Sequence, residues 1–83
     1  MKNPALYMRH GCYYCSMVMQ TIDNLGLDIE MKNIWEQDEH ELALIDATGR
    51  GVVPVLYYED DNQKPVWMPE SSDIIRFLKA QAA

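Results

Sequence analysis

Apolar positions in the first part of the chain change their spacing from one segment to the next. Residues 4–9 form a short apolar run that is typical of a strand. In residues 13–25, apolar side chains recur every three or four positions, a helical stripe that ends at Gly26. Residues 27–31 alternate between apolar and polar, which predicts a half-buried strand. We expect these elements to form a right-handed βαβ unit with parallel strands.

The middle of the chain predicts a second helix. Acidic residues from Glu36 to Glu39 precede an apolar set made of Leu42, Leu44 and Ile45. Carboxylates suit the first turn of a helix because the dipole there is positive. Residues 48–51, with two glycines, then end the predicted helix.

The last third of the chain predicts a hairpin followed by a helix. Residues 52–58 are rich in β-branched and aromatic side chains, residues 59–63 are typical of a turn, and residues 64–68 form the returning strand. Pro65 places that strand at a sheet edge. Residues 70–73 start the last helix with capping side chains, and its buried side carries Ile74, Ile75, Phe77 and Leu78.

Length, composition and charge favour one small domain, residues 1–83, expected in the cytoplasm. The 83 residues are 48% apolar, enough for a single core. Apolar stretches are far short of the ~20 residues that span a bilayer, and no secretory leader is visible. The net charge of −6 argues against a nucleic-acid surface. We therefore expect no membrane and no nucleic-acid partner.

The two cysteines of the chain, Cys12 and Cys15, stand where the first strand gives way to the first helix. Unpaired N–H groups of a first helical turn stabilise a thiolate, and the second cysteine lies close enough to resolve a mixed disulfide. This spacing indicates thiol–disulfide exchange. Zinc needs four ligands, and only His10 and His40 could add to the sulfurs. Their spacing matches no familiar site, so we expect no metal.

Three motifs in this order resemble the glutaredoxin family of the thioredoxin fold. They are Cys12-Tyr13-Tyr14-Cys15, Thr48-Gly49-Arg50-Gly51-Val52-Val53-Pro54 and Glu70-Ser71-Ser72-Asp73-Ile74. The resemblance covers nearly the whole chain. It implies an α/β fold of order β-α-β-α-β-β-α, with a four-stranded mixed sheet flanked by three helices.

The resemblance also implies roles for residues around the cysteines. Cys12 matches the nucleophile and Cys15 the resolving cysteine. Tyr14 matches a tyrosine whose ring flanks bound glutathione. Arg9 matches a cation that favours the thiolate and a substrate carboxylate, and Arg50 is a second candidate for binding the glycine carboxylate of glutathione.

Two further segments match positions where the family binds glutathione. Val53 and Pro54 match a valine–cis-proline pair whose valine backbone pairs with the cysteinyl part of glutathione. Ser71 and Ser72 match the helix start that receives the γ-glutamyl carboxylate, where free N–H groups seat an anion. Glu70 is placed to pair with the γ-glutamyl ammonium.

The chain departs from the glutaredoxin pattern at two places. Tyr13 replaces the proline of the family's Cys-Pro-Tyr-Cys motif. The last helix lacks the common Gly-Gly-Cys-Asp, and Pro69-Glu70-Ser71-Ser72 looks more like the Glu-Ser of the glutathione transferase N-terminal domain. That domain also binds the γ-glutamyl group of glutathione, so the resemblance to the transferase concerns glutathione binding rather than transferase activity.

The sequence thus predicts a monomeric, glutathione-dependent thiol–disulfide oxidoreductase acting through Cys12 and Cys15. Glutathione is the expected cosubstrate, with no tightly bound cofactor, and the expected protein partners are disulfide-containing or glutathionylated. Two alternatives stay open. One is a redoxin served by thioredoxin reductase, which the missing Gly-Gly-Cys-Asp favours. The other is a non-enzymatic iron–sulfur cluster carrier, which the missing motif proline favours.

Overall fold

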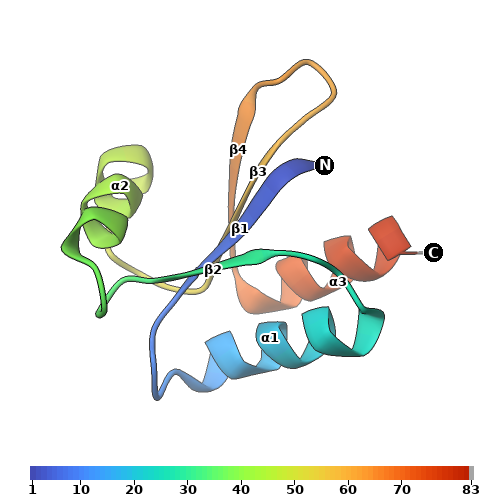
Figure 1. Cartoon of the computed structure of the whole chain (residues 1–83), viewed down its shortest axis with the longest axis horizontal. Coiled ribbons are helices and arrows are strands. Elements are labelled where there is room, and N and C mark those ends of the chain that lie inside the picture. Colours follow the sequence, from blue (N-terminus) through green and yellow to red (C-terminus); the bar gives the residue numbers. More distant parts are fainter. Residues whose placement is uncertain (83) are drawn as a thin grey trace.

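Seven elements build the fold in the predicted order, as the computed structural model of the chain shows for residues 1–82 (Figure 1). The predicted β-α-β-α-β-β-α arrangement is therefore confirmed. The elements are β1 (Lys2–Met8), α1 (Tyr13–Leu25), β2 (Glu30–Asn33), α2 (Asp38–Thr48), β3 (Val55–Glu59), β4 (Pro65–Pro69) and α3 (Ser71–Ala82).

The four strands form one mixed sheet in the order β2-β1-β3-β4. β1 and β2 run parallel, whereas β1 with β3 and β3 with β4 are antiparallel. β4 lies at an edge, as Pro65 predicted, because a proline has no N–H for a second neighbour. Within the described residues, the structure contains no helix that is both long and apolar enough to cross a membrane.

Helices cover both faces of the sheet, and each face has its own buried cluster. α1 and α3 pack against one another on one face, and α2 lies on the other (Figure 1). Side chains of a strand alternate between faces, so neighbouring residues of β1 enter different clusters. The α1/α3 cluster contains Leu6, Met8, Cys12, Cys15, Val18, Ile22, Ile29, Leu56, Ile74 and Leu78. The α2 cluster contains Ala5, Tyr7, Ile34, Leu44 and Val55.

The second strand differs from its predicted bounds. It begins at Glu30, and residues 27–29, which the alternation placed in the strand, connect it to α1. Gly26 ends α1 with φ 66°, and the N–H of Leu27 donates to Ile22 O at 3.1 Å, so this segment still belongs to the helix end. Pairing with β1 then continues to Asn33, which is buried, while Met31 is 40% exposed.

The third strand also begins later than its composition predicted. β3 starts at Val55, and Val52 is exposed. Pro54 has no backbone N–H to donate to a ladder, so regular pairing starts at the residue after it. The last helix has Ile74 and Leu78 fully buried, and Ile75 and Phe77 only partly.

Candidate functional site

Three chain segments meet at one end of the sheet because of its strand directions. β1 ends there and leads into the loop that carries Cys12. β3 runs antiparallel to β1, so it begins there, with Tyr7 opposite Val55. β4 ends there in turn, with Pro69 opposite Val55, and α3 starts two residues later. The register therefore brings together the three motifs that the sequence singled out.

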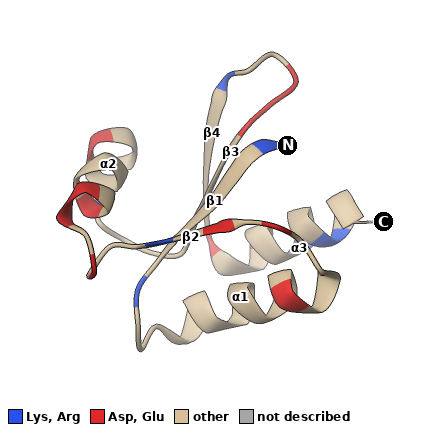
Figure 2. Cartoon of the chain, in the orientation of Figure 1, with Lys and Arg blue, Asp and Glu red and all other residues tan. Residues whose placement is uncertain are grey.

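Cys12 is the N-cap of α1. Its Sγ accepts a hydrogen bond from the backbone N–H of Cys15 at 3.2 Å, which is one of the N–H groups that a helix start leaves without an internal partner. No acidic residue lies in the first turn, and the half of α1 next to the cysteines is uncharged (Figure 2). Helix geometry thus places a partial positive charge against this sulfur.

Cys15 lies one helical turn further on, inside the core. Its side chain is fully buried, and both cysteines are free thiols in this structure. Burial, and then a hydrogen bond with Cys12, raise the pKa of the Cys15 thiol to about 12, although the backbone of Arg9 acts in the opposite direction. The two thiols are therefore unequal. Cys12 borders the surface with 9% of its area exposed, and Cys15 is held protonated behind it.

A groove of about 700 Å³ lies beside the start of α1. It contains six of the residues expected to bind glutathione, namely Tyr14, Val53, Pro54, Glu70, Ser71 and Ser72. The Val53–Pro54 peptide bond is cis, as expected. The sequence did not predict the following lining residues as ligand contacts: Met17, Ala47, Thr48, Val52, Val55, Trp67 and Pro69. Thr48 and Val52 could have been found, because both lie in the motif of residues 48–54 that resembles the glutaredoxin family.

The start of α3 supplies the polar end of this groove. Glu70 has a positive φ of 71°, which is uncommon outside glycine, and its carbonyl oxygen accepts the first helical hydrogen bond, from Ile74 N at 3.0 Å. The N–H groups and hydroxyls of Ser71 and Ser72 follow directly. Asp73 forms an ion pair with Arg76 at 2.6 Å, which reduces its repulsion of an anion at this helix start.

The structure separates Arg9 from this groove and places another arginine there. The Arg9 guanidinium lies over the Trp35 ring, 4.7 Å from its centroid, and Arg9 does not line the groove. Arg50 does line it and is its one cation among the described residues.

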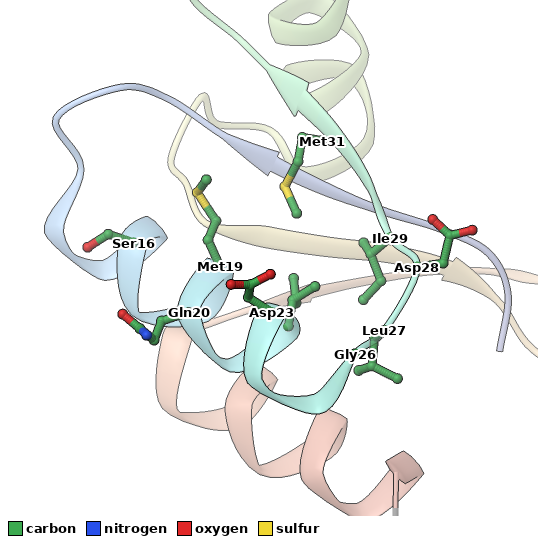
Figure 3. A pocket seen from close by; sticks show the side chains of 10 residues that line it. Ser16, Met19, Gln20, Asp23, Gly26, Leu27, Asp28, Ile29 and Met31 are labelled. Atoms are coloured by element: carbon green, nitrogen blue, oxygen red, sulfur yellow. The ribbon is translucent and has the colours of Figure 1, made fainter.

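A second hollow, of about 550 Å³, lies between α1 and β2. Met19 and Met31 face one another across it, and Asp23 and Asp28 lie at its border (Figure 3). Neither cysteine is among the lining residues of this hollow or of the groove, but no residue expected to bind glutathione lines this hollow, whereas six line the groove. The groove at the start of α1 is therefore the candidate site.

A fold with a cysteine at the start of its first helix and a cis-proline before its third strand is that of the thioredoxin class. The family model for the glutathione S-transferase N-terminal domain matches residues 6–83. The chain belongs to this family. No curated protein matches the chain significantly in sequence.

Solved structures of glutathione-related proteins share the fold. A glutathione transferase homologue from Sulfitobacter with bound glutathione has a TM-score of 0.72 and 17% identity over 99% of this chain. Reduced glutaredoxin C1 from Populus tremula x tremuloides has a TM-score of 0.70 and 19% identity, covering 98% of this chain and 68% of its own. A buckwheat glutaredoxin–glutathione complex has a TM-score of 0.69 and 19% identity, covering 96% and 71%. This chain spans 38% of the transferase homologue.

Proposed function

We propose that the protein is a glutathione-dependent thiol–disulfide oxidoreductase that acts through Cys12 and Cys15. The observation that supports this most strongly is the hydrogen bond from Cys15 N–H to Cys12 Sγ at 3.2 Å at an uncharged helix start. It stabilises negative charge on the Cys12 sulfur, while the Cys15 thiol stays protonated in the core. Membership of a glutathione-binding family supports the choice of cosubstrate.

The first step is capture of a disulfide. The Cys12 thiolate attacks the glutathione sulfur of a mixed disulfide, a Cys12–glutathione bond forms, and the substrate leaves as a thiolate that takes a proton from water. The thiolate of a second glutathione then attacks the bound glutathione sulfur. Oxidised glutathione leaves with two sulfurs bonded, and Cys12 is a thiolate again.

The second route uses Cys15 for protein disulfides. After Cys12 has captured one sulfur of the target, the Cys15 thiol gives its proton to water and its sulfur attacks Cys12 Sγ. The Cys12–Cys15 disulfide forms as the bond between Cys12 and the target breaks, and the target sulfur leaves as a thiolate that takes a proton from water, so both target thiols are reduced. Two glutathiones restore the thiols and leave as oxidised glutathione, so each turnover moves two electrons from glutathione to the target.

Bound glutathione occupies the groove in this proposal. Tyr14 flanks its cysteinyl part, and the backbone of Val53 pairs with it. The γ-glutamyl carboxylate lies at the start of α3, against the N–H groups and hydroxyls of Ser71 and Ser72, because free N–H groups there seat an anion. Glu70 pairs with the ammonium. Arg50 is better placed than Arg9 to bind the glycine carboxylate, since Arg50 lines the groove.

The expected partners are glutathione and disulfide-containing or glutathionylated proteins. We propose that the protein acts as a monomer. We also propose that it is cytoplasmic, because two reactive thiols suit a compartment that keeps thiols reduced.

The test compares cysteine variants in glutathione-coupled reduction of a small glutathione mixed disulfide and of a protein disulfide. Cys12→Ser should abolish both reactions because it removes the nucleophile. Cys15→Ser should retain the first and lose the second. Equal loss in both variants would contradict the assigned roles, and full activity of Cys12→Ser would contradict the proposal itself.

The same assay also shows which reductant serves the protein. One reaction contains glutathione and glutathione reductase, and a separate reaction contains thioredoxin reductase alone. Turnover with glutathione is the expected result, whereas turnover with thioredoxin reductase alone would identify the redoxin alternative. A brown colour with visible absorption after anaerobic purification would instead indicate an iron–sulfur carrier.

The family match favours one further candidate, the transfer of glutathione to an electrophile. In that reaction the groove would hold glutathione while its sulfur displaces a leaving group such as chloride from an electrophilic arene. Conjugation of a chloroarene that persists in Cys12→Ser would favour the transferase, because the reacting sulfur would then belong to glutathione.

A further inference from the structure

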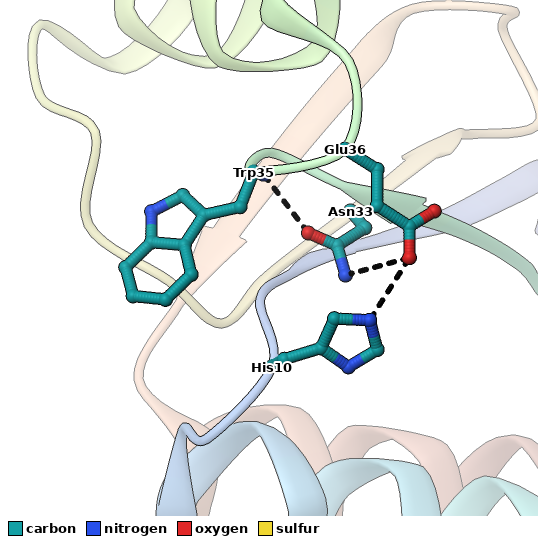
Figure 4. Close-up of polar contacts among 4 residues, drawn as sticks. All are labelled: His10, Asn33, Trp35 and Glu36. Carbon is teal, nitrogen blue, oxygen red and sulfur yellow. Dashed lines mark hydrogen bonds and ion pairs between the residues drawn. The ribbon is translucent and has the colours of Figure 1, made fainter.

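Two side-chain contacts join the loop that carries Cys12 to the loop between β2 and α2. We call residues 9–12 the Cys12 loop and residues 34–37 the β2–α2 loop. The Arg9 guanidinium lies over the Trp35 ring. One residue further, His10 Nε2 lies 2.9 Å from Glu36 Oε1 (Figure 4). Neighbouring residues of one loop thus bind neighbouring residues of the other.

The β2–α2 loop is itself anchored to the sheet by Asn33. This residue pairs with Met8 at the end of β2, and among residues 1–82 it is the one buried polar side chain, at 7% exposure. Its Oδ1 accepts from the Trp35 N–H at 2.9 Å, and its Nδ2 donates to Glu36 Oε1 at 3.4 Å (Figure 4). Both ends of the buried amide therefore fix the residues that contact the Cys12 loop.

The Cys12 loop in turn affects both sulfurs. It carries Cys12 itself, and the backbone and charge of Arg9 oppose the rise in the pKa of Cys15 that burial causes. His10 and Gly11 are exposed, and Gly11 has a φ of 72° with open space where a Cβ would lie. The Arg9 guanidinium also donates to His10 O at 3.2 Å, so the side chains of Arg9 and His10 supply contacts that hold this exposed part of the loop.

We propose that Trp35 and Glu36 are positioning residues for the two thiols. Through Arg9 and His10 they hold the Cys12 loop in the arrangement from which Cys15 attacks the captured sulfur. Neither residue touches the reacting atoms, and neither takes part in bond making. This inference rests on the proposed oxidoreductase function.

The kinetic test uses Glu36→Ala and Trp35→Ala with Glu39→Ala as the matched control. Glu39 is an exposed acid of the first turn of α2 and has no side-chain hydrogen bond within the described residues. A single exposed contact between two polar side chains is weak, so we expect Glu36→Ala to lower kcat for protein-disulfide reduction about threefold with unchanged KM. In the double variant that combines Trp35→Ala with Glu36→Ala, kcat should fall about tenfold, because the Cys12 loop then lacks both contacts.

Conservative replacement separates positioning from general stability. Gln at position 36 keeps an oxygen that accepts from His10 and Asn33, so Glu36→Gln should recover most of kcat. A loss of kcat in Glu36→Gln or Glu39→Ala as large as in Glu36→Ala would overturn the proposal. So would a loss that simply follows the free energy of unfolding across the variants.

An NMR measurement tests the loop without any turnover. The Cys15 amide donates to Cys12 Sγ, so its chemical shift in the reduced protein reports the position of that sulfur. It should move in Glu36→Ala and in Trp35→Ala and stay in place in Glu39→Ala. An unmoved Cys15 amide in the double variant would overturn the proposal. If the natural chain lacks glutathione-linked turnover but this shift still occurs, the proposed function fails and the positioning role stands.

Discussion

The two faces of the sheet differ in how firmly they hold their helices. On the α1/α3 face, both helices bury a stripe of side chains in a cluster of ten buried residues. On the other face, the cluster has five buried residues, and α2 contributes Leu44 alone while Leu42 and Ile45 stay exposed. The cysteines belong to the larger cluster. The fold therefore places both thiols on the firmly packed face.

Residues from both faces line the candidate groove. Tyr14 and Met17 come from α1, and Ala47 and Thr48 come from the end of α2. Regions with few buried apolar contacts open locally at a lower free energy than the core does. We therefore expect the α2 residues that line the groove to open more easily than the α1 residues do.

The largest expected difference comes from truncating one buried leucine on each face. Leu78 and Leu44 are both fully buried, in α3 and α2. Leu78→Ala should lower the free energy of unfolding by about 4 kcal/mol, because a well-surrounded cavity cannot collapse. Leu44→Ala should cost about 2 kcal/mol, since its smaller cluster relaxes more easily. Urea unfolding measures both, and equal losses would break the comparison between the faces.

A second test concerns Cys15 as a buried part of the α1/α3 face. Its pKa is raised from 9.0 to about 12, so above pH 9 the unfolded chain releases a proton that the folded chain retains. Stability from this group is complete below pH 9 and is lost as the pH rises toward 12.

Between pH 8 and about 10.5, the reduced protein should therefore lose about 2 kcal/mol more than Cys15→Ala does, from 1.4 kcal/mol per pH unit above 9. Urea unfolding under reducing conditions at both pH values gives the difference. Parallel losses in the two proteins would mean that water reaches Cys15.

The smallest expected effect on the free energy of unfolding comes from replacing the glycines that end α1 and α2. Gly26 and Gly49 have φ values of 66° and 82°, and a Cβ at either would meet open space. Alanine therefore carries the same backbone strain at both sites, of about 1 kcal/mol. Gly26→Ala should lower global stability by that amount. Gly49→Ala should lower it less and mainly speed amide exchange in α2, and a larger global loss for Gly49→Ala would contradict the proposed difference.

The sequence by itself determined the order of elements, the edge strand and the place of the cysteines at a helix start. These follow from local chemistry: apolar spacing, the missing N–H of Pro65, and glycine at helix ends. It also pointed to six residues that line the groove, although through resemblance to a family and not through spacing.

Only the tertiary structure decided where β2 begins, which arginine enters the groove and which loops touch. Asn33 is buried and Met31 exposed because pairing with β1 sets the register, and alternation along one segment carries no information about its partner. Arg9 lies on Trp35, 26 positions further along the chain, so its environment depends on contacts that no local pattern contains. The position of the thiols at a helix start follows from the local sequence and could be predicted. The contacts of the long charged side chains depend on partners that only folding brings near, so the sequence did not predict them.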